Sequence, residues 1–213
     1  MKRKLGIDGL MLMYVGNLEP YQGIELLLES FALALKTTEK ADLVIIGSQV
    51  SDIHQYQKKA LHLGILRKVH FCGPRPLEHL GEYPSEADIL VSPRITGNNT
   101  PMKIYSYLHS GTAILATDLP THTQLLDSRV AMLAEPSPKA FAAAMLRLIE
   151  DENLRRDLGL AGKKLVEEQY SYQVFRGKLR GLFDWLEMQV GREPLSRTTS
   201  PKSFMGVSKN SKR

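Results

Sequence analysis

The sequence predicts an α/β fold: a doubly wound, parallel, six-stranded sheet with extra C-terminal helices. Two observations support this fold class. Short apolar runs recur along the chain, many of them rich in Val, Ile or Leu and most bounded by Gly, Pro or Asp, which is typical of buried parallel strands. Amphipathic stretches of about 10 to 20 residues separate these runs, and crossovers of this length produce right-handed βαβ units.

Six segments have the composition of buried strands. They are residues 11–15, 42–46, 69–72, 88–92, 113–117 and 131–134. The first follows a basic start that superficially resembles a signal peptide, but Asp8 interrupts it and the apolar run is short, so we expect a strand. Cys72 is the only cysteine, which excludes an intramolecular disulfide; we expect a buried structural thiol.

Helical periods lie between the expected strands. The clearest is one apolar stripe with the spacing i, i+3, i+4, i+7 and i+11, formed by Ile24, Leu27, Leu28, Phe31 and Leu35. Shorter patterns of the same kind occupy about 52–63, 101–110 and 138–150. Ser137 is expected to cap the last of these, because Pro138 suits the first helical position.

Three helices without a further strand are expected at the C-terminal end of the fold. The final one, about 172–189, places apolar residues on one face: Phe175, Leu179, Leu182, Phe183 and Leu186. We expect residues 1–190 to form one domain. Residues 191–213 are rich in Ser, Thr, Lys and Arg and have little to bury, so we expect a basic, disordered tail.

The net charge of +5 belongs to the tail and not to the fold. Residues 191–213 hold six of the 28 Lys and Arg and one of the 23 Asp and Glu, which leaves 22 of each in the rest. A neutral fold argues against nucleic-acid binding, because phosphate backbones are held by clustered cations. We expect a cytoplasmic protein, with peripheral attachment to anionic lipid through the tail as the alternative.

Candidate functional residues are those that directly follow a strand, because ligands of open α/β sheets bind beyond the carboxyl ends of the strands. The turn 16–23 follows the first expected strand and opens the first helix. Gly16 and Gly23 bracket this turn, so its backbone can approach a phosphate and direct free helix N–H groups toward it. An ordinary βα turn is the alternative.

A second polar segment follows the fourth expected strand. Pro101 suits the first turn of the next helix, with Asn99 or Thr100 as its cap and Gly111 at its end. Arg94 and Lys103 flank this helix start, so that the helix dipole, unpaired N–H groups and two cations would converge on an anion. The alternative is a capped structural helix with solvent-facing charges.

No metal site is expected. The six histidines lack paired metal spacing and lack the context of a nucleophile triad, so we expect surface or packing roles for His54, His62, His70, His79, His109 and His122.

In their order and spacing, several segments together resemble the C-terminal domain of the group 1, or family four, glycosyltransferases of the GT-B fold. The matching segments are 14–23, 43–47, 69–73, 87–93, 99–105 and 110–118. The resemblance covers roughly residues 10–188. It implies that residues 1–190 form a Rossmann-like domain that binds a nucleotide-diphosphate sugar.

The resemblance implies a retaining sugar transfer from a UDP- or GDP-sugar without a metal cofactor. By position, the donor diphosphate would be held by Gly16, Asn17, Gln22, Gly23, Arg94, Asn98, Asn99, Thr100, Pro101, Met102 and Lys103. Gly73, Pro74 and Arg75 would lie along the base, and Ser106 would face the ribose. No catalytic residue is assigned.

This chain departs from the family pattern at four of these places. Asn17 and Gln22 stand where the common pattern has Arg and Lys after the first strand. Asn98 and Ser106 stand where it has two glutamates eight residues apart. Hydrogen-bonding capacity is kept but charge is not, and we hypothesise that the two cations flanking the helix start take over the cationic role.

The family's N-terminal domain, which binds the acceptor, is not found in this sequence, which starts about ten residues before the first expected strand. We therefore expect the chain alone to be incomplete as an enzyme unless a second polypeptide supplies that half. Two further readings stay open. One is a non-catalytic sugar-nucleotide-binding or regulatory module, and the other is a different enzyme on a similar sheet, such as a nucleotide-sugar epimerase.

Overall fold

The computed structural model describes residues 1–76 and 81–190. Its contacts divide the chain into two compact units, Met1–Ser171 and Tyr172–Arg213. The first contains a sheet and its covering helices, and the described part of the second is one helix, α9 (Tyr172–Val190). The predicted domain limit at residue 190 stays a prediction, while His79 and the predicted tail lie outside the described residues.

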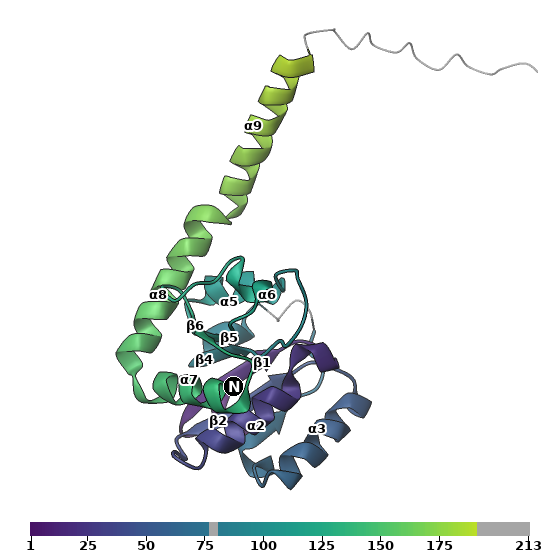
Figure 1. Ribbon diagram of the computed structural model, residues 1–213, viewed down its shortest axis with the longest axis vertical. Helices are drawn as coiled ribbons and strands as arrows, with labels where there is room; N and C mark the ends of the chain where they lie inside the picture. Colours follow the sequence, from purple (N-terminus) through teal and green to yellow (C-terminus); the bar gives the residue numbers. More distant parts are fainter. Residues whose placement is uncertain (77–80, 191–213) are drawn as a thin grey trace, which may run out of the picture. The chain divides into compact units, whose positions relative to one another are not determined.

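The first unit is built on one six-stranded sheet in the order β3-β2-β1-β4-β5-β6 (Figure 1). All five strand pairs are parallel, so the doubly wound fold class is confirmed. The strands are β1 (Leu10–Val15), β2 (Ala41–Ile46), β3 (Val69–Phe71), β4 (Ile89–Ser92), β5 (Ala113–Thr117) and β6 (Met132–Ala134).

Helices and short helical turns connect these strands. The turns are η1 (Pro20–Gln22) and η2 (Leu66–Lys68). The helices are α1 (Lys2–Leu5), α2 (Ile24–Ala34), α3 (Val50–His62), α4 (Tyr83–Glu86), α5 (Lys103–Ser110), α6 (Pro120–Thr123), α7 (Pro138–Glu150) and α8 (Glu152–Gln169).

Both faces of the sheet are covered, because successive side chains of each strand point to opposite faces. Leu12 and Tyr14 of β1 pack into a cluster with α2, α3 and α7. Met11 and Met13 of the same strand pack into a second cluster with α5 and the end of α8 (Figure 1). This double burial explains why the strands read as nearly continuous apolar runs.

The order of the strands fixes where a ligand can bind. The chain builds outward from β1 through β2 to β3, then returns to the other side of β1 for β4. The crevice at this switch lies beyond the carboxyl ends of β1 and β4. Those strands end at Val15 and Ser92, so the loops that follow these two residues face the crevice.

Two local predictions at helix ends are confirmed. Ser137 precedes α7 and its hydroxyl oxygen accepts a hydrogen bond from the Ala140 N–H at 3.3 Å. Gly111 ends α5 with φ 73°, in the left-handed conformation that glycine adopts readily.

Two other local predictions are wrong. Helix α5 begins at Lys103 and its N-cap residue is Met102, so neither Asn99 nor Thr100 caps it and Pro101 precedes it. Cys72 lies one residue beyond β3 and is half-buried, as are His70 and Phe71, because β3 is an edge strand of the sheet.

The described part of the second unit is a single amphipathic helix. Helix α9 confirms the predicted 172–189 period and buries none of its residues. Its exposed apolar side chains include Phe175, Leu179, Leu182, Phe183 and Leu186. None of the helices in the described part of the chain has the length and apolar content that a membrane crossing requires.

Candidate functional site

The loops that follow β1 and β4 lie against each other. The backbone N–H of Ile95 donates to the carbonyl of Tyr21 at 3.0 Å, and the Arg94 guanidinium lies 5.0 Å from the centre of the Tyr21 ring. Gly23 has φ 72°, and a Cβ on it would lie 2.0 Å from the carbonyl oxygen of Pro93. No side chain fits there, so Gly23 is required for this close approach.

Lys103 points back from α5 to the loop after β1. Its ammonium nitrogen lies 3.9 Å from the centre of the Tyr14 ring and donates to the side-chain oxygen of Gln22 at 3.4 Å. A Cβ built on Gly16 would lie 3.3 Å from the same nitrogen. Within residues 1–76 and 81–190, no carboxylate forms an ion pair with Lys103.

Burial shapes the protonation of Lys103. Loss of hydration, with a smaller effect from the positive charge of Arg94, lowers the pKa of Lys103 to about 7. A negatively charged ligand would supply the missing counter-charge. The amine therefore has the character of an anion-binding group whose partner is not a residue of the described chain.

Asn17 and Gln22, the two amides that replace charged residues of the family pattern, bond to each other. The Gln22 amide donates to the Asn17 side-chain oxygen at 2.9 Å, and the Tyr14 hydroxyl donates to the Asn17 backbone carbonyl at 2.6 Å. Together with Lys103 these residues form one connected polar network below the turn. The network fixes the orientation of the Lys103 side chain.

Arg94 is held by its own loop. Its Nε donates to the Thr96 carbonyl at 2.8 Å, and its terminal nitrogens lie 3.4 Å from the backbone and side-chain oxygens of Asn99. These contacts order the loop and leave a half-buried guanidinium at its surface. Arg94 is thus both a structural and a charged element of the candidate site.

The remaining predicted diphosphate-binding residues differ in exposure. Asn98 and Asn99 are exposed on the loop, Thr100 is half-buried, Pro101 is buried, and Met102 is 79% exposed. Asn98 and Met102 make no side-chain hydrogen bond to another described residue. The predicted diphosphate set is therefore brought together in space along two adjacent loops.

The predicted base and ribose residues extend this edge of the sheet. The Gly47 N–H donates to the Gly73 carbonyl at 2.8 Å, which aligns the loops after β2 and β3. Pro74 and Arg75 follow and are exposed, and Ser106 is exposed one helical turn beyond the start of α5. These residues share the carboxyl edge, but no described contact joins them to Lys103.

Sequence reasoning missed the importance of His122. This residue lies on α6, is fully buried, and its Nε2 is 2.8 Å from the Ser92 hydroxyl. Its other ring nitrogen is 3.0 Å from the carbonyl of Thr117. One sequence feature could have pointed to His122: it follows the fifth strand closely and so lies at the same sheet edge as the candidate site.

The Ser92 and His122 pair does not have the arrangement of a nucleophile and its base. Both side chains are 0% exposed, so no substrate reaches the hydroxyl. The group that orients the imidazole is a backbone carbonyl and not a carboxylate. We therefore assign this pair to the support of the loops.

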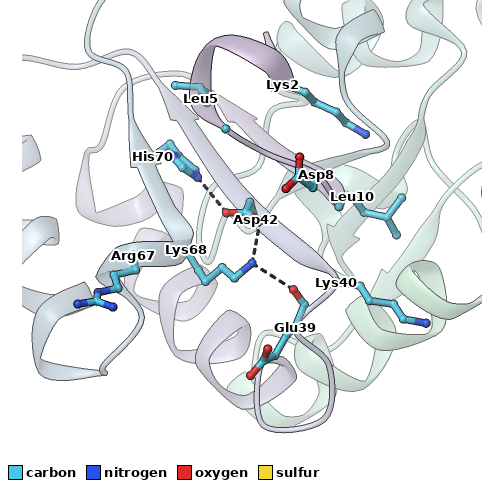
Figure 2. A pocket seen from close by; sticks show the side chains of 12 residues that line it. Lys2, Leu5, Asp8, Leu10, Glu39, Lys40, Asp42, Arg67, Lys68 and His70 are labelled. Carbon is cyan, nitrogen blue, oxygen red and sulfur yellow. Dashed lines mark hydrogen bonds and ion pairs between the residues drawn. The ribbon is translucent and has the colours of Figure 1, made fainter.

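A pocket of about 860 Å³ lies at the opposite, amino edge of the sheet (Figure 2). Asp42 at its centre accepts one hydrogen bond from Lys68 at 3.0 Å and pairs with His70 at 3.0 Å. The lining combines Lys2, Lys40, Arg67 and Lys68 with Asp8, Glu39 and Asp42. These charges nearly balance, so the pocket does not favour ligands of one sign.

In the parts of the chain that the structure covers, no three His, Cys, Asp or Glu side chains group so as to hold a metal ion. The chemistry that the candidate site offers is therefore that of Lys103, Arg94, the amides and the positive end of the α5 dipole. Such groups bind and stabilise negative charge.

Comparison with known proteins gives the fold and the family. The structure is similar to the C-terminal domain of a group 1 family glycosyl transferase (LpcC) from Francisella tularensis, with a TM-score of 0.71 and 21% identity, covering 80% of this chain and 91% of that one. It is also similar to HepE from Anabaena in complex with UDP-glucose, with a TM-score of 0.76 and 14% identity, covering 86% and 51% of the two chains. The chain thus has the fold of the C-terminal half of a GT-B glycosyltransferase.

A curated relative gives the same result at the level of sequence. D-inositol 3-phosphate glycosyltransferase from Corynebacterium diphtheriae is 26% identical over 157 residues, which is 70% of this chain and 36% of that protein. The chain spans less than half the length of the curated relatives it matches, between 36% and 47%. The family "Glycosyl transferases group 1" matches residues 1–165, and the chain belongs to this family.

Proposed function

We propose that this chain is the donor-binding half of a retaining glycosyltransferase and that it binds a nucleotide-diphosphate sugar. The observation that carries the proposal is the half-buried Lys103 amine at the junction of the loops after β1 and β4, which pairs with no carboxylate of the described residues. The similar fold of HepE, whose structures hold UDP and UDP-glucose, supports a nucleotide sugar as the ligand.

In this proposal the two cations hold the donor diphosphate. Lys103 and Arg94 face it at the start of α5, whose dipole also favours an anion. The diphosphate gains negative charge as the sugar leaves, so groups fixed in advance stabilise the transition state more than the bound substrate. The network of Asn17 and Gln22 holds Lys103 in place for this role.

The nucleoside would extend along the same edge of the sheet. We place the base beside Gly73, Pro74 and Arg75 and the ribose beside Ser106. The alignment of the loops after β2 and β3 by the bond between Gly47 and Gly73 supports this placement. UDP- and GDP-sugars are both compatible with it.

Acceptor binding would fall to a second half, in the same or in a separate polypeptide. The chain matches less than half the length of its curated relatives, which supports this division. The apolar face of α9 is exposed and is the surface that we propose for contact with that half.

One observation favours a second function, a non-catalytic sugar-nucleotide-binding module. Asn17, Gln22, Asn98 and Ser106 are uncharged where the family pattern has charged residues. A site that keeps Lys103 but lacks the paired glutamates can bind a donor without completing a transfer.

Calorimetric titration of the full chain with UDP-glucose, UDP, GDP and ADP tests the donor site. We expect saturable binding of one nucleotide class and a loss of affinity of about tenfold or more in Lys103→Ala, because one charge-assisted contact contributes about 1.5–3 kcal/mol. Lys40→Ala is the matched control, since Lys40 is an exposed lysine at the amino edge. Equal affinity of wild type and Lys103→Ala would refute the assignment.

A further inference from the structure

The segment from β5 to α6 makes several hydrogen bonds to the loop after β4. The Thr117 hydroxyl donates to the Arg94 carbonyl at 2.5 Å, and the Thr121 hydroxyl donates to the Asn99 carbonyl at 2.8 Å. The Gln124 amide donates to the Asn98 carbonyl. The loop is thus held largely through its backbone carbonyls, and the exposed Asn98 side chain makes no hydrogen bond to another described residue.

His122 lies at the centre of this segment and joins it to β4. Its Nδ1 is 3.0 Å from both the carbonyl and the hydroxyl oxygen of Thr117, and its Nε2 is 2.8 Å from the hydroxyl of Ser92. Ser92 is the last residue of β4, directly before the loop. One buried imidazole therefore connects the ends of two neighbouring strands at the point where the loop departs.

The hydrogen-bond partners of His122 determine which ring nitrogen carries the hydrogen. A carbonyl oxygen can only accept, so Nδ1 carries the hydrogen and Nε2 accepts from the Ser92 hydroxyl. Burial, opposed by the bond to Thr117 and reinforced by the charges of Lys103 and Arg94, lowers the pKa of His122 to about 4. The imidazole is therefore neutral at neutral pH, and a neutral ring suits a site that already holds two cations.

We propose that His122 is a positioning residue that holds the 93–100 loop in its donor-binding geometry. The inference rests on the proposed donor-binding function. Through Thr117 the ring fixes the carbonyl of Arg94, and through Ser92 it fixes the start of the loop. The Arg94 guanidinium and the α5 start thereby keep fixed places before a ligand arrives, which reduces the ordering cost of binding.

Hydrogen–deuterium exchange of the unliganded full chain tests the positioning directly. His122→Phe keeps a ring but removes both hydrogen bonds, and Thr117→Val keeps the volume but removes the bond to Arg94. We expect the Ile95 amide, whose N–H donates to the Tyr21 carbonyl in the ordered loop, to exchange about tenfold faster or more in both variants. Ser30→Ala is the matched control, because Ser30 is 0% exposed and bonds to Leu26 within α2, away from the loop.

Affinity for UDP-glucose, measured below the melting temperature of every variant, tests the functional consequence. We expect about tenfold or more weaker binding in His122→Phe, partial recovery in His122→Asn, whose amide can still donate to Thr117, and no change in Ser30→Ala.

Loop exchange in His122→Phe no faster than in Ser30→Ala overturns the inference. Faster exchange with undiminished affinity also overturns it. A wild-type chain that binds none of UDP-glucose, UDP, GDP and ADP overturns the proposed function instead, while the exchange result still decides whether His122 positions the loop.

Discussion

The ammonium nitrogen of Lys103 lies 3.9 Å from the centre of the Tyr14 ring, where it faces aromatic carbon and an amide oxygen but no carboxylate of residues 1–76 or 81–190. A cation over an aromatic face is stabilised, but less than a cation in water or beside an acid. The Lys103 charge is therefore only partly compensated in the free protein. A bound diphosphate would supply the remaining counter-charge.

Affinity for UDP-glucose should fall as pH rises above neutrality. The pKa of Lys103 in the free protein is about 7, and a bound diphosphate would raise it. Above pH 7 the free amine is mostly neutral, so binding must take up a proton and weakens by up to about tenfold per pH unit. Titration calorimetry from pH 6.5 to 8.5 measures this, and UDP-glucose is suitable because its diphosphate has no proton to lose in that range.

The control for this pH dependence is Lys103→Met, which keeps an unbranched side chain one atom shorter and removes the amine. Its affinity should be lower and independent of pH over the same interval. A wild-type affinity that stays constant or rises with pH would contradict the role of Lys103.

The fold could be predicted because its signals are local. Each strand is a short apolar run, and the right-handed crossover rule converts the alternation of strands and helices into a doubly wound sheet. Ser137 and Gly111 also act through nearby backbone groups, and both predictions are confirmed. The start of α5 was predicted wrongly, because Pro101 and Thr100 have the right residue types for a helix start but the helix begins two residues beyond Pro101.

The candidate site could be predicted only in part. The loops after β1 and β4 were identified because they follow strands, and the structure brings them together. The contact of Lys103 with Tyr14 and that of His122 with Ser92 join residues 89 and 30 positions apart. Such contacts depend on three-dimensional packing, which residue types and spacing do not encode locally.

Gly23→Ala should weaken donor binding and lower stability. The added Cβ would lie 2.0 Å from the Pro93 carbonyl, so the loops after β1 and β4 would have to separate. We expect a stability loss of about 1–3 kcal/mol beyond the backbone strain. Gly64→Ala is a close control, because Gly64 has φ 71° but has nothing within 4 Å of a built Cβ. If the two variants lose equal stability in urea denaturation and both keep wild-type affinity, the contact between Gly23 and Pro93 is not important.

Ser137→Ala should destabilise the first unit modestly. The Ser137 hydroxyl accepts from the Ala140 N–H, which otherwise has no partner at the start of α7. Loss of such a cap costs about 1 kcal/mol. Ser128→Ala removes an exposed hydroxyl that makes no hydrogen bond to another described residue, and its urea midpoint should match the wild type. A Ser137→Ala midpoint equal to that of Ser128→Ala would show that the cap does not stabilise α7.

Gly159→Ala should destabilise the protein more than the loss of a cap, because α8 contacts the end of α5 at this glycine. A Cβ on Gly159 would lie 2.1 Å from the Gly111 carbonyl, and neither backbone can yield without shifting a helix. The expected loss is about 1–3 kcal/mol, measured by urea denaturation. Gly177→Ala on α9 makes the same chemical change in a helix where a built Cβ meets nothing within 4 Å. That variant should be neutral or slightly stabilising, since alanine favours helix by about 1 kcal/mol over glycine. If Gly159→Ala is as stable as Gly177→Ala, α8 can shift away from the end of α5 without loss of stability. The close packing of Gly159 against Gly111 would then contribute nothing to the stability of the fold.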